Sequence, residues 1–126
     1  MERQIRVLVA DRLKLMREVI IETFADQPDI EIVGEVQEET EILPRVQETR
    51  PDFLFIGMDD PETRPALCDA VLRLHPGVNI IAVAPHANRT VCYWASYDIH
   101  SRILESSEQG ILEAVRRRTS LSGGAS

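Results

Sequence analysis

The stretch that decides the fold is Pro51-Asp52-Phe53-Leu54-Phe55-Ile56-Gly57-Met58-Asp59-Asp60-Pro61. Its apolar run, residues 53–56, is bounded by Pro-Asp on one side and by Asp-Asp-Pro on the other. A short, continuously apolar run is typical of a strand covered on both faces, as in a parallel sheet with helices on either side. In a doubly wound sheet, ligands bind at the loops that follow such strands. We therefore expect the residues around Gly57 to determine the function.

The sequence on either side of this stretch alternates between strand-like and helix-like patterns. Short apolar runs predict further strands over residues 5–10, 30–36, 79–84 and 102–104. Helices are predicted over residues 13–24, 38–49, 66–74, 89–97 and 107–118. In the first helix the apolar face consists of Leu13, Met16, Ile20 and Phe24. Pro44 predicts a late start or a kink in the second helix, and Ser107 is the expected N-cap of the last.

Five strands that alternate with five helices predict a parallel sheet covered on both faces, because right-handed βαβ crossovers place helices there. The expected fold is a flavodoxin-like three-layer α/β/α sandwich, with a five-stranded parallel sheet in the order 2-1-3-4-5. We expect one domain over residues 1–118. Residues 119–126 are expected to form a flexible C-terminal tail or the stub of a linker.

The composition argues against several classes of partner. The chain of 126 residues has a formal net charge of −7, whereas contacts to nucleic-acid phosphates need clustered Lys and Arg. The basic run at 116–118 is interpreted as complementing the dipole at a helix C-terminus. No secretory apolar segment follows Met1, and no apolar run reaches membrane-spanning length. We therefore expect a cytoplasmic protein that binds neither membranes nor, through this domain, nucleic acid.

Cofactor chemistry has little support in the sequence. Cys68 and Cys92 are isolated cysteines without a C-x-x-C pair, so they are expected to remain reduced thiols. His75, His86 and His100 share no metal-ligand spacing. The sequence also lacks a Gly-rich or Ser/Thr-rich phosphate loop. We expect no bound metal, no cofactor and no enzymatic activity.

Four segments carry a resemblance to a known family: IRVLVAD at 5–11, PDIEIVGEV at 28–36, RPDFLFIGMDDP at 50–61 and LHPGVNIIAVAPH at 74–86. Their order and spacing resemble the receiver domain of two-component response regulators. Residues 28–35 most resemble receivers that precede a LuxR-type helix-turn-helix. The resemblance covers about residues 3 to 118.

The resemblance implies a specific phosphorylation site. Receivers of this family hold Mg²⁺ with two acidic residues after the first strand, and an Asp after the central strand takes a phosphoryl group from a histidine kinase. A Thr or Ser on the fourth strand and a Lys on the fifth bind that group, and an aromatic residue near the fifth strand reports the switch. Magnesium requires oxygen ligands, and phosphoryl transfer requires neutralisation of the phosphoryl charge.

Most of these side chains are absent at the matching positions of this sequence. Asp11 matches one acidic position, but its neighbour is Arg12, a cation where a carboxylate should hold the metal. The acceptor position is Gly57, which has no side chain to phosphorylate. The remaining positions match Ala84 (Thr or Ser), Glu105 or Leu104 (Lys) and Arg102 (the switch aromatic). The resemblance therefore implies a receiver fold without its reaction, a pseudo-receiver that acts as a phosphorylation-independent interaction module.

Two alternatives and one internal contact stay open at this point. Asp59 or Asp60 could serve as a displaced acceptor in a conventional phospho-receiver, or the same sheet edge could bind a small molecule, as flavodoxin-like proteins bind FMN. Arg12 is expected to form an ion pair with Asp11, Asp59, Asp60 or Glu105, which would replace the metal and lock one conformation.

The expected partner is a signalling protein or a second copy of the chain. Tyr93, Trp94 and Tyr97 crowd into the predicted helix at 89–97, at the usual output surface of receivers. Trp94 is expected to fill the space left by Ala84 and the absent switch aromatic, whereas Tyr93 and Tyr97 are expected to be exposed and to anchor the partner. The sequence does not identify the partner, the pathway, the oligomeric state or an effector domain in a longer chain.

Overall fold

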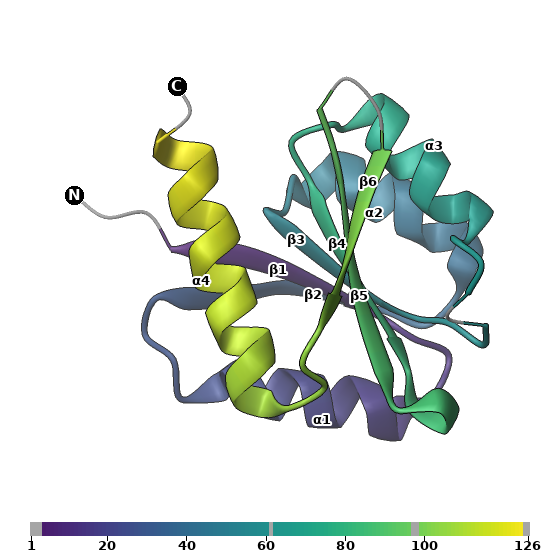
Figure 1. The fold of residues 1–126 in the computed structure, drawn as a ribbon, viewed down its shortest axis with the longest axis horizontal. Helices are drawn as coiled ribbons and strands as arrows, with labels where there is room; N and C mark the ends of the chain where they lie inside the picture. Colours follow the sequence, from purple (N-terminus) through teal and green to yellow (C-terminus); the bar gives the residue numbers. More distant parts are fainter. Residues whose placement is uncertain (1–3, 61, 97–98, 125–126) are drawn as a thin grey trace.

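The computed structural model describes residues 4–60, 62–96 and 99–124 of the chain. Over these residues, six strands form one sheet: β1 (Ile5–Ala10), β2 (Ile30–Val36), β3 (Phe53–Gly57), β4 (Asn79–Ala84), β5 (Arg89–Ala95) and β6 (Ile99–Leu104). The α-helices are α1 (Lys14–Ala25), α2 (Ile42–Thr49), α3 (Ala66–Leu74) and α4 (Glu108–Gly124). Two short 3₁₀ turns, η1 (Glu39–Glu41) and η2 (Pro85–Ala87), complete the described elements. Figure 1 shows this arrangement.

The sheet is mixed, with strand order β2-β1-β3-β4-β5-β6. β1 to β4 are parallel and lie in the order predicted for the first four strands. β5 pairs antiparallel with β4, and β6 pairs antiparallel with β5. The expectation of five parallel strands and five helices is therefore wrong over residues 89–104, whereas the last expected helix is present as α4.

The error lies at residues 89–97, where a helix was predicted. Residues 89–95 form β5, and four of them, Thr90, Val91, Tyr93 and Trp94, are of types that favour strands. The turn before it, η2, has three residues and ends at Asn88, whose φ of 48° is left-handed. Because parallel strands need a crossover of a dozen or more residues, so short a turn can only return the chain antiparallel.

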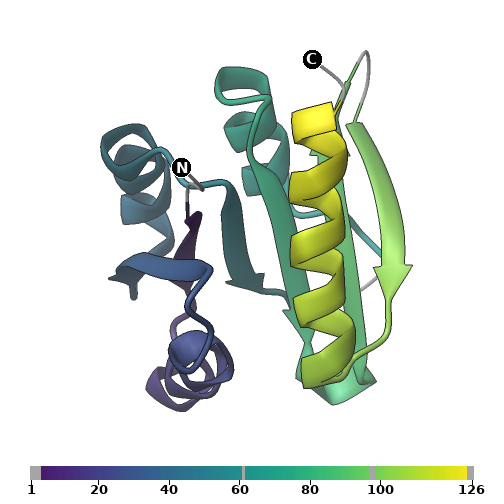
Figure 2. The ribbon, with the colours of Figure 1, turned by 90° about the vertical axis from the view of Figure 1, so that its left-hand side faces the viewer.

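The core has two parts, one on each face of the sheet. On one face α2 and α3 contribute Ile42, Val46, Cys68, Val71 and Leu72 against alternate residues of β1, β3 and β4. On the other face α1 and α4 contribute Ile20, Phe24 and Val115. There the rings of Phe24 and Phe55 meet edge to face, with centroids 5.2 Å apart. The three layers agree with the predicted sandwich (Figures 1 and 2).

Local signals at the helix ends are mostly confirmed. α2 begins at Ile42, so Pro44 lies in its first turn, where proline is tolerated. The hydroxyl of Ser107 accepts a hydrogen bond from the backbone N–H of Gly110 at 3.1 Å, as an N-cap does. In α1, however, Leu13 is not on the inner face: it precedes the helix and is exposed.

The basic run at 116–118 does not lie at a helix end, because α4 continues to Gly124. Arg116 instead forms a bidentate ion pair with Asp29, at 2.9 and 3.0 Å, that ties α4 to the start of β2. This hydrogen bonding lowers the pKa of the Asp29 carboxyl below its ordinary value. Among the described helices, none combines the length and apolarity needed to span a bilayer.

Candidate functional site

The candidate site lies at the carboxyl edge of the sheet, where β1 and β3 end. A hollow of about 470 Å³ opens there, between the β1–α1 loop, the end of β3 and η2. Its lining includes Asp11, Arg12, Gly57 and Asp59 from the predicted site. The remainder of the lining is largely apolar, with Leu13, Met16, Ile42, Met58, Pro65, Leu67 and Pro85 among its residues. Sequence reasoning therefore placed four site residues together correctly.

Four other predicted positions, Ala84, Arg102, Glu105 and Asp60, do not line this hollow. Ala84 ends β4 and is buried, and its antiparallel neighbour in the register is Arg89. Arg102 and Glu105 line a separate cavity of about 160 Å³ between β6 and α4. They are displaced because β6, unlike the fifth strand of the family pattern, is separated from β4 by an antiparallel β5.

The space beside Gly57, the position that the resemblance assigns to the acceptor, is occupied by a neighbouring carboxylate. A Cβ built on Gly57 would overlap Oδ2 of Asp11 and lie 3.0 Å from its Cγ. Asp11 is held in this orientation because its Oδ1 accepts a hydrogen bond from the backbone N–H of Leu13 at 2.9 Å. The retained acidic side chain thus occupies the space that a side chain at position 57 would need.

The expected ion pair of Arg12 is wrong. Its side chain is exposed, and no carboxylate of the described residues lies within salt-bridge distance of it. The reason is geometric: one oxygen of Asp11 is directed to the Leu13 amide, and Asp60 is engaged in its own loop.

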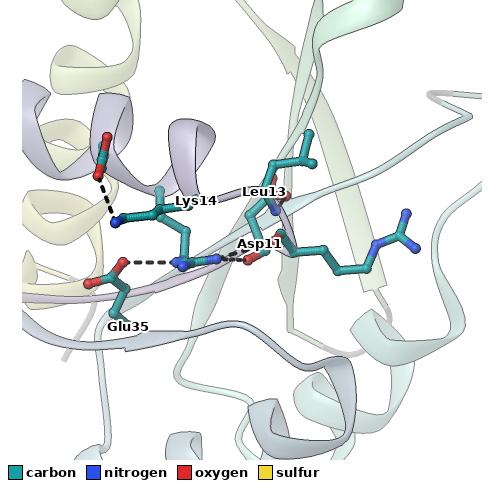
Figure 3. A network of polar contacts seen from close by, with 7 residues as sticks. Asp11, Leu13, Lys14 and Glu35 are labelled. Atoms are coloured by element: carbon teal, nitrogen blue, oxygen red, sulfur yellow. Dashed lines mark hydrogen bonds and ion pairs between the residues drawn. The ribbon is translucent and has the colours of Figure 1, made fainter.

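A different arginine, Arg17, forms an ion pair near this edge of the sheet, and its partner is none of the four expected carboxylates. Its Nε lies 2.8 Å from a Glu35 carboxylate oxygen, and its Nη1 donates to the Asp11 carbonyl at 2.7 Å. A longer contact of 3.4 Å reaches the Arg12 carbonyl. Figure 3 shows Glu35 directed at the guanidinium that bonds the backbone at Asp11. A nearly buried cation therefore ties the β1–α1 loop to β2.

The two candidates for a displaced acceptor, Asp59 and Asp60, differ in their hydrogen bonding and in their position relative to the hollow. Both carboxylate oxygens of Asp60 are used in the loop after β3: Oδ1 accepts from the Glu62 amide and Oδ2 from the Thr63 hydroxyl, each at 2.9 Å. Asp59 is exposed and lines the hollow beside Asp11. The same loop is also held to β5, because Arg89 pairs with Glu62 at 2.8 Å.

The predicted aromatic surface is wrong for Tyr93. In a strand, successive side chains point to opposite faces, so Tyr93 lies with Ala84 in the core on the α2/α3 face and is 4% exposed. Burial raises the pKa of its phenol. Trp94 lies on the opposite face, half-buried, and stacks on His100 with ring centroids 5.4 Å apart. Trp94 therefore does not lie on the face of Ala84, whereas Tyr93 shares that face and pairs with Ile80 of β4. Tyr97 lies outside the described residues.

Known proteins similar to this chain in sequence are regulators and modifying enzymes. No protein-family model matches it. A protein-glutamate methylesterase/protein-glutamine glutaminase of Methanospirillum hungatei is 37% identical over 57 residues, which is 45% of this chain and 17% of that protein. The transcriptional regulatory protein BtsR of Escherichia coli is 39% identical over 74 residues, covering 48% of this chain and 31% of BtsR. The chain thus spans less than half the length of these relatives.

The fold is similar to those of solved receiver domains. The receiver domain of NarL from Mycobacterium tuberculosis superposes with a TM-score of 0.58 at 21% identity, over 67% of this chain and 68% of that one. The response regulator domain of Thermotoga maritima CheB gives a TM-score of 0.55 at 27% identity, over 65% and 61%. The chain therefore has the fold of a response-regulator receiver domain, except that its last two strands form an antiparallel hairpin.

Proposed function

We propose that this chain is a pseudo-receiver: a non-enzymatic, cytoplasmic signalling module that acts through protein contacts without taking a phosphoryl group at the family's acceptor position. The observation that carries the proposal is the overlap between the Asp11 carboxylate and the space beside Gly57. The acceptor is missing as a residue, and its volume is also occupied. A substitution at position 57 alone would therefore require the Asp11 carboxylate to shift.

The charges around the hollow support the same proposal. Magnesium in phosphoryl-transfer sites is held by carboxylates and substrate oxygens. Here Arg12 stands at the position that the resemblance assigns to one of these carboxylates, and Arg17 donates a hydrogen bond to the backbone carbonyl of Asp11. Within the described part of the chain, no group of three or more His, Cys, Asp or Glu side chains is arranged to hold a metal. The Arg17 guanidinium, paired with Glu35, instead holds the β1–α1 loop through its hydrogen bond to the Asp11 carbonyl.

A conventional phospho-receiver with a displaced acceptor is the competing function. Asp59 is the residue that would carry it, because it is exposed at the hollow, whereas both oxygens of Asp60 already accept hydrogen bonds. Against this alternative, Ala84 offers no hydroxyl and Glu105 no ammonium to bind the phosphoryl oxygens.

Beryllofluoride tests the proposal, since it imitates the phosphoryl group on a receiver aspartate only when Mg²⁺ also binds. We expect Mg²⁺ with beryllofluoride to leave unchanged both the melting temperature and the NMR chemical shifts of the backbone amides of Asp11, Gly57 and Asp59. A receiver that retains its acceptor, treated in parallel, is the positive control. A saturable shift that is lost in Asp59→Asn would contradict the pseudo-receiver and establish Asp59 as the displaced acceptor.

A further inference from the structure

The two edges of the sheet differ in how they are protected against pairing with another strand. At the β2 edge the register with β1 shifts between Val7 and Leu8, and ion pairs of Glu31 with Arg6 and of Glu35 with Arg17 lie along the strand. Irregularities and charges of this kind discourage edge-to-edge pairing. At the other edge, β6 pairs with β5 in unbroken register from Ile99 to Leu104 and contains no proline. β6 is therefore the less protected edge.

The side chains of β6 alternate between the two faces of the sheet. Ile99, Ser101 and Ile103 lie on the α2/α3 face, opposite Ala95, Tyr93 and Val91 of β5. His100, Arg102 and Leu104 lie on the α1/α4 face. Ile103 is 64% exposed although its neighbour Val91 is buried. In Figure 2, β6 is the outermost strand, and α4 covers one face of this part of the sheet.

We propose that β6 pairs antiparallel with β6 of a second copy of this chain, in a register centred on Ser101. A two-fold axis perpendicular to the sheet keeps each face continuous across the two copies, so every residue must oppose one from the same face. Centring on Ser101 opposes Ile99 to Ile103 of the second copy, and His100 to Arg102 of the second copy. Each Ile103 thereby gains an apolar cross-strand partner, and such pairs stabilise a sheet.

Charge selects this register from its competitors. Within the six residues of β6, only centres at Ser101 and Arg102 pair five residues on each copy, over 99–103 or 100–104. The centre at Arg102 would oppose the two Arg102 guanidiniums directly, and like charges in that arrangement are destabilising. The centre at Ser101 places only two small hydroxyl side chains on the axis. Because a single short strand pair buries little surface, the dimer is weak and depends on concentration.

Disulfide cross-linking of variants with a single cysteine introduced in β6 tests the proposed register directly. In the proposed dimer, Cα atoms at position 101 lie about 4.5 to 5.5 Å apart, within the span of a disulfide. The two Cα atoms at position 102 are two residues apart along the strand direction, so they are separated by about 7 Å along the strands in addition to the spacing between the strands. For position 103 the separation along the strands is about 14 Å. Cys68 and Cys92 will not compete, since both are buried and burial raises the pKa of the Cys68 thiol to about 12.

We expect Ser101→Cys, oxidised mildly at high micromolar concentration, to give about tenfold more disulfide-linked dimer than Arg102→Cys or Ile103→Cys. Ile103 is strongly exposed, so random collision would cross-link Ile103→Cys at least as well. Equal cross-linking of the three variants, dominance of Arg102→Cys or Ile103→Cys, or no cross-link in Ser101→Cys would each overturn the proposal.

A second measurement uses no cysteine. Ile103→Glu should weaken self-association of the full chain at least about tenfold in sedimentation velocity, because each copy would oppose a carboxylate to Ile99. Leu15→Glu is the matched control: it removes an apolar side chain that is 71% exposed on α1, away from the edge. Wild-type association in Leu15→Glu is expected, and equal loss in both variants would contradict edge pairing. This inference does not depend on the phosphorylation chemistry at Gly57.

Discussion

Replacing Tyr93 by Ala is expected to lower the free energy of unfolding by about 3 kcal/mol, as truncation of a large buried side chain does. Tyr93 is 4% exposed and packs in the same cluster as Val71, Ile80 and Val91, so the variant leaves a cavity between β5 and α3. This is the opposite of the effect expected from an exposed anchor in a helix. Urea denaturation followed by circular dichroism measures it.

Tyr93→Phe is the matched control, because it retains the ring and removes only the hydroxyl. We expect it to stay within about 1 kcal/mol of the wild type. If Tyr93→Ala instead kept wild-type stability while losing self-association or partner binding, Tyr93 would be a surface residue and the hairpin formed by β5 and β6 would be wrong.

Replacing Arg17 by Met is expected to cost about 2 kcal/mol of folding free energy. The substitution keeps an unbranched apolar stem but removes the hydrogen bond to the Asp11 carbonyl and the ion pair with Glu35. Glu35 is half-exposed and can regain water, which is why the cost stays below that of a fully buried pair. The β1–α1 loop should also exchange its amide protons faster.

Arg12→Met makes the same chemical change five residues earlier and provides the comparison. Its guanidinium is exposed and has no carboxylate partner among the described residues, so we expect a change within about 0.5 kcal/mol. Thermal unfolding with and without Mg²⁺ distinguishes the two variants. Equal destabilisation by both, or a larger effect of Arg12→Met, would show that Arg12 rather than Arg17 holds the loop.

The first four strands were predictable because their signals are local. Each is a short apolar run that ends at turn residues, and the first three βα units are long enough for crossovers. The hairpin formed by β5 and β6 was not, because Tyr93 and Tyr97 at a spacing of four suggest a helical stripe as readily as a strand. Whether these residues form a strand or a helix depends on the short η2 turn and on pairing with β4 and β6. A short stretch of sequence contains no information on that pairing.

At the site, the residue types were predictable but their contacts were not. The family resemblance located Gly57, Asp11 and Arg12 at one edge, and the hollow confirms that they lie together. The direction of the Asp11 carboxylate depends on the Leu13 amide, which the sequence does not reveal. Arg17 did leave a signal: it shares the buried helical face of Ile20 and Phe24, where a charge requires a partner. Glu35 on β2 is that partner.

The most direct test of the pseudo-receiver is the intact mass of the protein after incubation with acetyl phosphate and Mg²⁺, for the wild type and for Gly57→Asp. We predict no added phosphoryl group in the wild type. Gly57→Asp alone should also stay unmodified, because its side chain would displace Asp11, and because Ala84 and Glu105 still provide no donor to the phosphoryl oxygens. A gain of one phosphoryl group in the wild type, mapped to Asp59 or Asp60, would contradict the proposed function.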